Sequence, residues 1–254
     1  MIQLPPNVTI VVPFGFAGSG KGYVYETLVQ HTKPGTKTRV VKLAFADLLK
    51  DVVALLFGWD RELLAGTTAV SRAWREQVDP YWDDRLHSFW GQPITPRYVL
   101  QRFGTEVVRQ TVHADFWVLA LERRLQTLIQ QAGQFDETYI VIDDCRFLNE
   151  AQMVLQYDRT RLIFLMRSLP VWVQTVVYLM FPTIPCSVVS REAREWFVGN
   201  LQQCPAQWQQ YARESGVHQS EWDWFSFFTL SQPISILWND RDGSIWEQLQ
   251  PILA

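Results

Sequence analysis

The sequence predicts an α/β protein with an open, mostly parallel β-sheet and helices on both faces. Short apolar segments rich in β-branched residues recur along the chain, and stretches with helical periodicity separate them. This alternation is typical of βαβ units, whose crossover connections place helices on a parallel sheet. The chain has 254 residues, 48% of them hydrophobic, so it has enough apolar side chains for a substantial core.

Five segments have the composition of buried parallel strands. They are residues 8–12, 39–43, 139–142, 161–165 and 234–238. The helices expected between them are 23–31, 47–57, 96–110, 117–131, 148–156 and 191–213. In an open sheet of this kind, functional groups gather at the carboxyl ends of the strands. We therefore expect the residues that follow each strand to converge.

A glycine-rich turn follows the first of these strands. Gly15-Phe16-Ala17-Gly18-Ser19-Gly20-Lys21 has the spacing of a P-loop, in which backbone N–H groups and a helix N-terminus hold phosphates and the lysine reaches their oxygens. The alternative is a glycine turn with an incidental lysine, but the strand before it and the helix after it favour the P-loop. Most P-loops continue with Ser or Thr, whose hydroxyl ligates Mg²⁺. Gly22 and Tyr23 follow here, so the metal needs another anchor or is held mainly by water.

The helix expected from residue 96 begins at Thr95-Pro96-Arg97, because Thr is a good N-cap and Pro a favoured first residue. At 100° per residue, Arg97 and Gln101 lie on one side, which can face a ligand. Gly104 inside the helix indicates close approach of a ligand or another backbone. An ordinary amphipathic helix with solvated arginines is the alternative. Three apolar residues form the expected buried stripe: Leu100, Phe103 and Val107.

Asp143-Asp144-Cys145-Arg146 places two carboxylates and a guanidinium directly after the third strand. A P-loop enzyme has groups for Mg²⁺ and its water shell at this position. Asp144 is the better candidate to hold the metal through water. Arg146, and Arg167 after the fourth strand, are suited to neutralise a transferring phosphoryl group. Surface salt bridging is the alternative for each arginine.

The net charge indicates the class of partner, and the cysteines indicate the compartment. The formal net charge is −3, so we expect no broad basic surface and no stable nucleic-acid binding, and a small anionic partner is favoured. Cys145, Cys186 and Cys204 form no CxxC pair, which suits a reducing cytoplasm and gives no structural metal site. The N-terminus lacks the pattern of a secretory signal.

Residues 168–190 contain no charged side chain and have the length of a membrane span. Pro182 and Pro185 interrupt this run. We therefore expect the segment to be buried or to form a subunit interface, and we expect no membrane contact.

Six motifs follow one another along the chain. They are Gly15 to Lys21, Phe45-Ala46-Asp47-Leu48-Leu49-Lys50, Thr95-Pro96-Arg97 with Leu100 to Glu106 and Arg109, Asp144-Cys145-Arg146-Phe147-Leu148-Asn149-Glu150-Ala151, His218-Gln219-Ser220-Glu221, and Asn239-Asp240 with Gly243. Taken in order, these motifs resemble those of bacteriophage deoxynucleoside monophosphate kinases, and the match covers nearly the whole chain.

The resemblance implies a single P-loop kinase domain over residues 1–254, with 44–135 as a helical acceptor-binding region and 168–217 as a lid or insert. It implies transfer of the γ-phosphoryl group of ATP, with Mg²⁺, to a deoxynucleoside monophosphate. It also implies a cytoplasmic protein, located in the host cytoplasm if a phage encodes it, and a possible homodimer. Lys21, Arg146, Arg167 and Asp144 are the implied catalytic residues. The implied ATP-binding residues are Gly15, Gly18, Ser19, Gly20, Lys21, Gly22, Tyr23, Asn239 and Asp240. The implied acceptor-binding residues are Phe45, Asp47, Arg97, Gln101, Gly104, Thr105 and Trp117, with Trp117 stacking on the base.

Two points depart from this pattern, and two stay open. The family's P-loop usually continues Gly-Lys-Asp-Thr, whereas Gly22 and Tyr23 stand here, and Arg241-Asp242 is a small insertion before Gly243. For His218 and Glu221 a structural role is favoured over general acid/base work, because the acceptor phosphate is already ionised. Two alternative functions remain: a P-loop kinase that acts on a hydroxylated base in DNA, and a non-catalytic nucleotide-binding module.

Overall fold

The computed structural model describes residues 1–32, 35–180, 191–240 and 243–253. The chain divides into two compact units, one formed by residues 1–44 with 125–254 and the other by residues 45–124. The first unit contains the predicted parallel sheet, with five described strands in the order β2-β3-β1-β4-β5. The strands are β1 (Val8–Phe14), β2 (Thr38–Leu43), β3 (Glu137–Ile142), β4 (Thr160–Met166) and β5 (Ile234–Trp238). All five predicted strand segments are confirmed.

The central strand β1 explains why this sheet forms. All seven of its residues are buried, and it pairs in parallel with β3 on one side and β4 on the other. A strand buried on both faces needs apolar side chains at every position, not at alternate ones. Because β1 lies in the middle of the sheet, the turn that follows it begins at the centre of the carboxyl edge.

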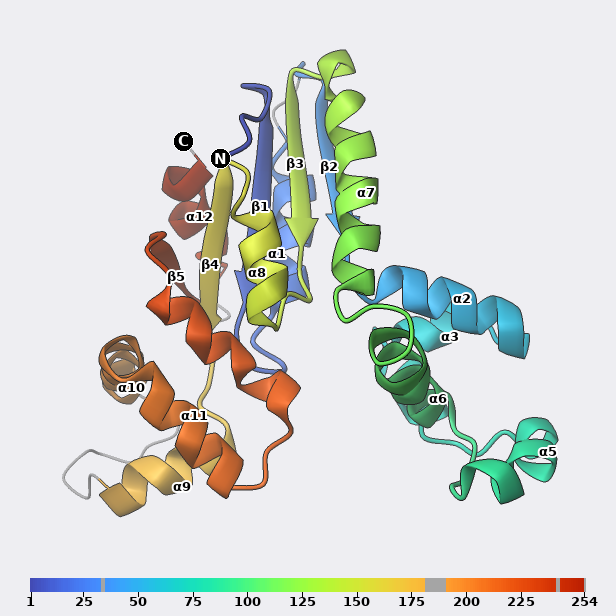
Figure 1. Ribbon diagram of the computed structural model, residues 1–254. Helices are drawn as coiled ribbons and strands as arrows, with labels where there is room; N and C mark the ends of the chain where they lie inside the picture. Colours follow the sequence, from blue (N-terminus) through green and yellow to red (C-terminus); the bar gives the residue numbers. More distant parts are fainter. Residues whose placement is uncertain (33–34, 181–190, 241–242, 254) are drawn as a thin grey trace. The chain divides into compact units, whose positions relative to one another are not determined.

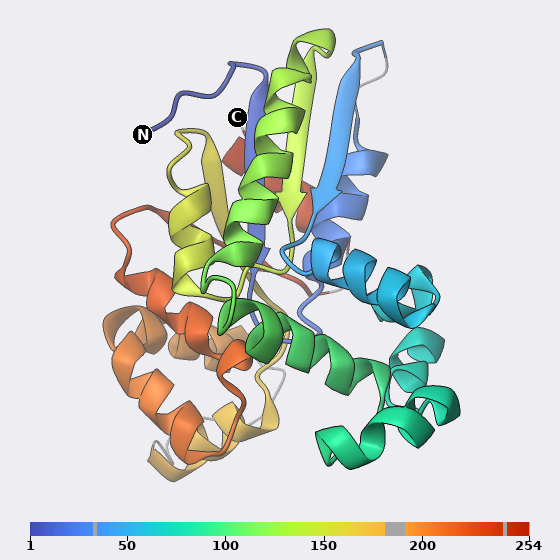
Figure 2. The ribbon, with the colours of Figure 1, turned by 45° about the vertical axis from the view of Figure 1, so that its right-hand side comes forward.

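Helices cover both faces of the sheet (Figures 1 and 2). On one face, α1 (Lys21–Gln30) and α12 (Ile245–Leu253) pack on a cluster that includes Val11 of β1 and Leu165 of β4. On the other face lie α8 (Leu148–Val154) and the 3₁₀ segment η4 (Asp223–Thr229). There Phe14 and Phe164 pack on Trp224, with ring centroids 5.8 and 5.2 Å away. The alternation of side chains along each strand explains why Phe164 and Leu165 serve opposite layers.

The unit of residues 45–124 is helical. Its core holds the buried side chains of Val53, Leu64, Ile94 and Val99. Short polar side chains start four of its helices: the side chains of Asp60, Thr68, Asp79 and Thr95 accept backbone N–H groups of the turns that follow them. The helices are α2 (Asp47–Phe57), α3 (Arg61–Ala65), α4 (Ala69–Trp74), α5 (Pro80–Trp90), α6 (Pro96–Arg102), the π-helix η1 (Phe103–Arg109) and the beginning of α7 (Phe116–Gln130).

The single helix predicted for residues 96–110 is wrong in its second half. Its start at Thr95 and Pro96 is confirmed, but the α-helical turns end at Arg102 and seven π-helical residues follow. A π-helix has more residues per turn, so the spacing from Leu100 to Val107 no longer returns to the same face. Val107 is therefore 39% exposed instead of buried. Leu100 and Phe103, the other two residues of the predicted stripe, are half-buried, whereas Val99 and Gly104 are buried.

The helix predicted for residues 191–213 is two helices, α10 (Arg191–Gln203) and α11 (Pro205–Glu214). The break falls at Pro205, which has no N–H to donate and clashes with a preceding turn of helix. Before them lies α9 (Val171–Met180), where Val173 and Val177 are buried and Val171 is exposed.

The remaining part of the charge-free run, with Pro182, Pro185 and Cys186, lies outside the described residues. Of the other two cysteines, Cys145 is buried and Cys204 exposed, and neither forms a disulfide. Within the described ranges, no helix combines the length and the hydropathy that a membrane span needs.

Candidate functional site

The turn after β1 has the backbone of a phosphate-binding loop. Gly15, Gly18 and Gly20 have φ values of 137°, 76° and 96°, a range that favours glycine. A Cβ on Gly15 would lie 2.6 Å from the carbonyl oxygen of Leu165, and one on Gly20 would lie 2.4 Å from the amide nitrogen of Asn239. Glycine is therefore required at Gly15 and Gly20 for space as well as for backbone conformation.

The ammonium group of Lys21 lies inside this loop. Its Nζ donates to the carbonyl oxygens of Gly15 at 3.0 Å and Phe16 at 2.9 Å. Burial, followed by the nearby charge of Arg146, lowers the pKa of Lys21 from 10.5 to about 8. Burial makes the charged form of Lys21 less stable than it is in water. An anion that binds beside the ammonium group would therefore stabilise it.

Residues from the ends of β4 and β5 brace the loop. Asn239 donates from Nδ2 to the Ser19 carbonyl at 2.9 Å, and Arg167 donates from Nη1 to the Gly18 carbonyl at 2.9 Å. The hydroxyl of Ser19 is buried and has no hydrogen-bond partner among the described residues, so it can donate a hydrogen bond to a ligand oxygen. A pocket of about 340 Å³ opens beside the loop. Its lining residues are Gly20, Tyr23, Arg167, Asn239, Gly243 and Ile245.

Asp240, the neighbour of Asn239, has a structural partner. Its carboxylate lies 2.7 Å from Nη1 of Arg194, a side chain that is almost fully buried. Arg194 also donates from Nη1 to the carbonyl of Arg167 at 3.0 Å. Asp240 thus helps to hold the segment that carries Arg167.

The two carboxylates after β3 have different surroundings. Asp143 pairs with Lys42 at 2.6 Å, and its Oδ2 lies 3.6 Å from where a Cβ on Gly22 would be. The side of the loop that lacks a hydroxyl therefore faces a carboxylate. The sequence favoured Asp144 as the residue that holds the metal through water. The charges of both carboxylates raise the pKa of Lys21, and the effect of Asp143 is the larger. The described residues contain no cluster of three or more His, Cys, Asp or Glu side chains that could hold a metal ion.

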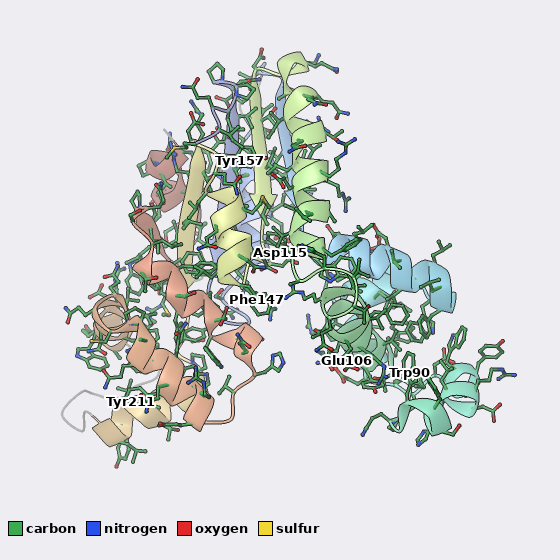
Figure 3. All side chains as sticks on the ribbon, viewed as in Figure 1. Trp90, Glu106, Asp115, Phe147, Tyr157 and Tyr211 are labelled. Carbon is green, nitrogen blue, oxygen red and sulfur yellow. The ribbon has the colours of Figure 1, made fainter. Side chains whose placement is uncertain are left out.

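Arg146 is held by two glutamates. Its Nη1 lies 3.0 Å from Oε1 of Glu221, and its backbone N–H donates to Oε2 of the buried Glu150 at 2.8 Å. The same oxygen accepts from the backbone of Phe147, the residue before α8 (Figure 3). Sequence reasoning gave Glu150 no role and Glu221 only a general structural one. A glutamate three residues after a helix cap was the available signal for Glu150.

The helical unit brings two of the predicted acceptor residues to one pocket. This pocket has a volume of about 160 Å³. Arg97 and Gln101 line it together, as their helical spacing predicts. Arg75 also lines it, and no motif in the sequence pointed to that residue. The complete lining is Ala46, Leu49, Lys50, Arg75, Arg97, Leu100 and Gln101.

The other predicted acceptor residues do not line this pocket, and most of them are buried or paired with a protein group. Trp117 is 5% exposed and donates from its indole nitrogen to the Gly104 carbonyl at 2.9 Å, which leaves little of its ring open to a base. A Cβ on Gly104 would lie 3.0 Å from Leu49, so the close neighbour of this glycine in the structure is a side chain of α2. Phe45 is buried. Asp47 pairs with Arg61 at 3.1 Å, and Thr105 is exposed.

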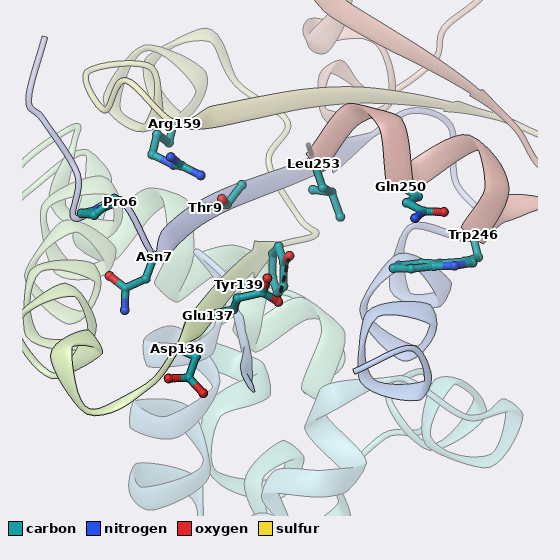
Figure 4. A pocket seen from close by; sticks show the side chains of 10 residues that line it. All are labelled: Pro6, Asn7, Thr9, Asp136, Glu137, Tyr139, Arg159, Trp246, Gln250 and Leu253. Atoms are coloured by element: carbon teal, nitrogen blue, oxygen red, sulfur yellow. Dashed lines mark hydrogen bonds between the residues drawn. The ribbon is translucent and has the colours of Figure 1, made fainter. Parts of the chain in front are cut away.

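A further pocket of about 550 Å³ lies near the amino ends of β1 and β3 (Figure 4). Arg159, Glu137 and Tyr139 are among its lining residues, and none of the predicted site residues is. The amino ends of parallel strands are the edge opposite to the one where ligands bind in open α/β sheets. Two candidate sites therefore remain, the loop of residues 15–21 in one unit and the pocket lined by Arg97 in the other.

Comparison with known proteins supports a kinase relationship over part of the chain. No known family model matches the sequence. A segment of 72 residues, 28% of this chain, is 38% identical to the deoxynucleoside-5'-monophosphate kinase of Escherichia phage T5. The match spans a quarter of the length of that protein. In part of its length, the chain is thus similar to a nucleotide kinase.

Proposed function

We propose that this protein transfers the γ-phosphoryl group of ATP to the 5′-phosphate of a deoxynucleoside monophosphate. The loop of residues 15–21 carries the proposal, because its positive-φ glycines and buried ammonium group suit a polyphosphate. The acceptor class is supported by the partial similarity to the phage kinase and by the arginine-lined pocket of the helical unit.

In this reaction an oxygen of the acceptor phosphate attacks the γ-phosphorus, the bond to the β-phosphate oxygen breaks, and ADP leaves. The acceptor is already ionised at neutral pH, so repulsion between anions is the main barrier and positive charge is the main requirement. We assign Lys21 to the donor phosphates, Arg146 and Arg167 to the transferring group, and Arg97 with Gln101 to the acceptor phosphate.

Magnesium fits the carboxylates after β3 better than it fits the loop. Gly22 offers no ligand, whereas Asp143 and Asp144 offer oxygens, and Mg²⁺ is often held through its waters. These two carboxylates would hold the ion. When bound, Mg²⁺ neutralises charge on the β- and γ-phosphates. Lys42 pairs with Asp143 at 2.6 Å and would keep this carboxylate in place for the ion.

The direct test is ATP consumption with each deoxynucleoside monophosphate, with DNA and with no acceptor. We expect turnover only with monophosphates, and formation of the diphosphate and ADP. Lys21→Ala should abolish it, whereas Lys37→Ala, a change at an exposed lysine, should not. Arg97→Ala should mainly raise the KM of the acceptor.

The same assay separates the alternatives. Turnover with DNA alone would identify a DNA-base kinase. Nucleotide binding without turnover would identify a non-catalytic module, the alternative that the missing P-loop hydroxyl at Gly22 favours. Equal turnover with no acceptor would contradict the kinase proposal.

A further inference from the structure

Two arginines of the helical unit, Arg75 and Arg97, lie close together, and they differ in their hydrogen-bond partners. The Nε of Arg97 donates to Glu76, and both side chains are about half exposed, at 44% and 55%. The Nε of Arg75 is buried and has no hydrogen-bond partner among the described residues. Burial, followed by the positive charge of Arg97, lowers the pKa of Arg75. The fold therefore holds two guanidinium groups together although they repel each other.

The backbone fixes this pair. The N–H of Arg97 donates to the carbonyl of Arg75 at 3.0 Å, which ties the start of α6 to the end of α4. Gly66, at the end of α3, lies directly against the guanidinium group: a Cβ there would be 2.5 Å from Cζ and Nη1 of Arg75. A residue with any side chain at position 66 would displace the Arg75 guanidinium. Gly66 thus positions Arg75.

The pocket that these residues line is suited to a phosphate group. Its lining includes the cations Lys50, Arg75 and Arg97, an amide donor from Gln101, and no carboxylate. Its volume of about 160 Å³ is small beside pockets that enclose whole ligands. A paired guanidinium site of this size fits one phosphate, bound through charge-assisted hydrogen bonds.

We propose that Arg75 binds the acceptor phosphate together with Arg97, and that Glu76 is the carboxylate that this phosphate displaces from Arg97. The identity of the acceptor rests on the proposed function, whereas the anion site does not. Ion pairs between exposed side chains are weak, so a phosphate dianion replaces Glu76 easily. Glu76 lowers the affinity of the site, and Arg75, whose buried Nε lacks a partner, supplies the stronger contact.

Binding of 2-deoxyribose 5-phosphate and of inorganic phosphate to the full chain, with the loop of residues 15–21 saturated by ADP, tests this, with isothermal titration calorimetry as the measurement. We expect Arg75→Ala to raise both dissociation constants at least tenfold and Arg75→Lys to have an intermediate effect. Glu76→Gln should lower them about two- to fivefold. Arg85→Ala, which removes an exposed arginine of the same unit, should change neither constant. Unchanged binding in Arg75→Ala, or weaker binding in Glu76→Gln, would overturn the proposal.

Glycine substitutions test the positioning role with a matched control. Gly66 and Gly91 both end helices of this unit with φ near 69°, but the space around a Cβ on Gly91 is empty. Alanine introduces similar backbone strain at both positions. We expect Gly66→Ala to weaken phosphate binding as much as Arg75→Ala does, and Gly91→Ala to leave it unchanged. Equal weakening in both variants would assign the effect to strain and refute the role of Gly66.

These outcomes can be separated from failure of the proposed function. If phosphate binds as described but no deoxynucleoside monophosphate supports ATP turnover, the kinase proposal fails and the anion site stands. If turnover occurs and Arg75→Ala alters neither phosphate affinity nor the KM of the acceptor, the assignment of Arg75 fails and the kinase proposal stands.

Discussion

At the scale of single residues, we expect Lys21 to make the proposed nucleotide binding depend on pH. Its pKa is lowered to about 8, so the ammonium form dominates at neutral pH and is lost as pH rises through 8. Only the charged form attracts phosphates. We expect the dissociation constant of ADP to increase above pH 8, approaching tenfold per pH unit. Titration calorimetry from pH 7 to 9.5 measures this, and Lys21→Arg, which stays charged, should remove the pH dependence. A flat wild-type profile would contradict the prediction.

Glu221 provides a second prediction at the residue scale. It pairs with Arg146 at 3.0 Å, and its negative charge raises the pKa of Lys21. Glu221→Gln should release Arg146 and lower kcat about tenfold, the equivalent of about 1.4 kcal/mol. It should also move the midpoint of the ADP pH profile below 8. Glu214→Gln, at an exposed glutamate that contacts Gln210, is the matched control. A normal kcat with an unchanged midpoint would show that Glu221 does not position Arg146.

At the scale of elements, the loop between β1 and α1 combines two constraints that mutation separates. Alanine at Gly18 meets open space and adds only the strain of a positive φ, about 1–2 kcal/mol. Alanine at Gly15 adds a clash with the Leu165 backbone, which cannot rotate away. We expect Gly15→Ala to lower the free energy of unfolding by at least about 3 kcal/mol in urea titrations. Equal losses in the two variants would mean that the clash relaxes.

Helix boundaries show how far sequence patterns reach at this scale. All five strands were predicted from β-branched apolar runs, because burial on both faces leaves a clear composition. The helices α3, α4 and α5 were not predicted, because each has at most one buried residue and no long apolar stripe. Their caps, Asp60, Thr68 and Asp79, were the readable signal. The π-helix after Arg102 had no such signal in the sequence.

At the scale of the whole molecule, the residues that we assign to the donor and those that we assign to the acceptor phosphate belong to different compact units. Hydrogen–deuterium exchange tests this division. ADP should protect amides of residues 15–23, and a deoxynucleoside monophosphate alone should protect amides around residues 46–50 and 97–101. Arg75→Ala should remove the second protection and keep the first. Protection of the P-loop by the monophosphate alone would contradict the separate assignment of donor and acceptor sites.

The sequence by itself determined the α/β class, the strand segments, the glycine turn after β1 and the grouping of Arg97 with Gln101, because these depend on local composition and on spacing within one element. Only the tertiary structure brought Arg75 and Gly66 to Arg97, Glu221 to Arg146, and Asp143 beside Gly22. These contacts join elements that no short-range pattern connects, and their positions are set by packing and backbone hydrogen bonds across the fold.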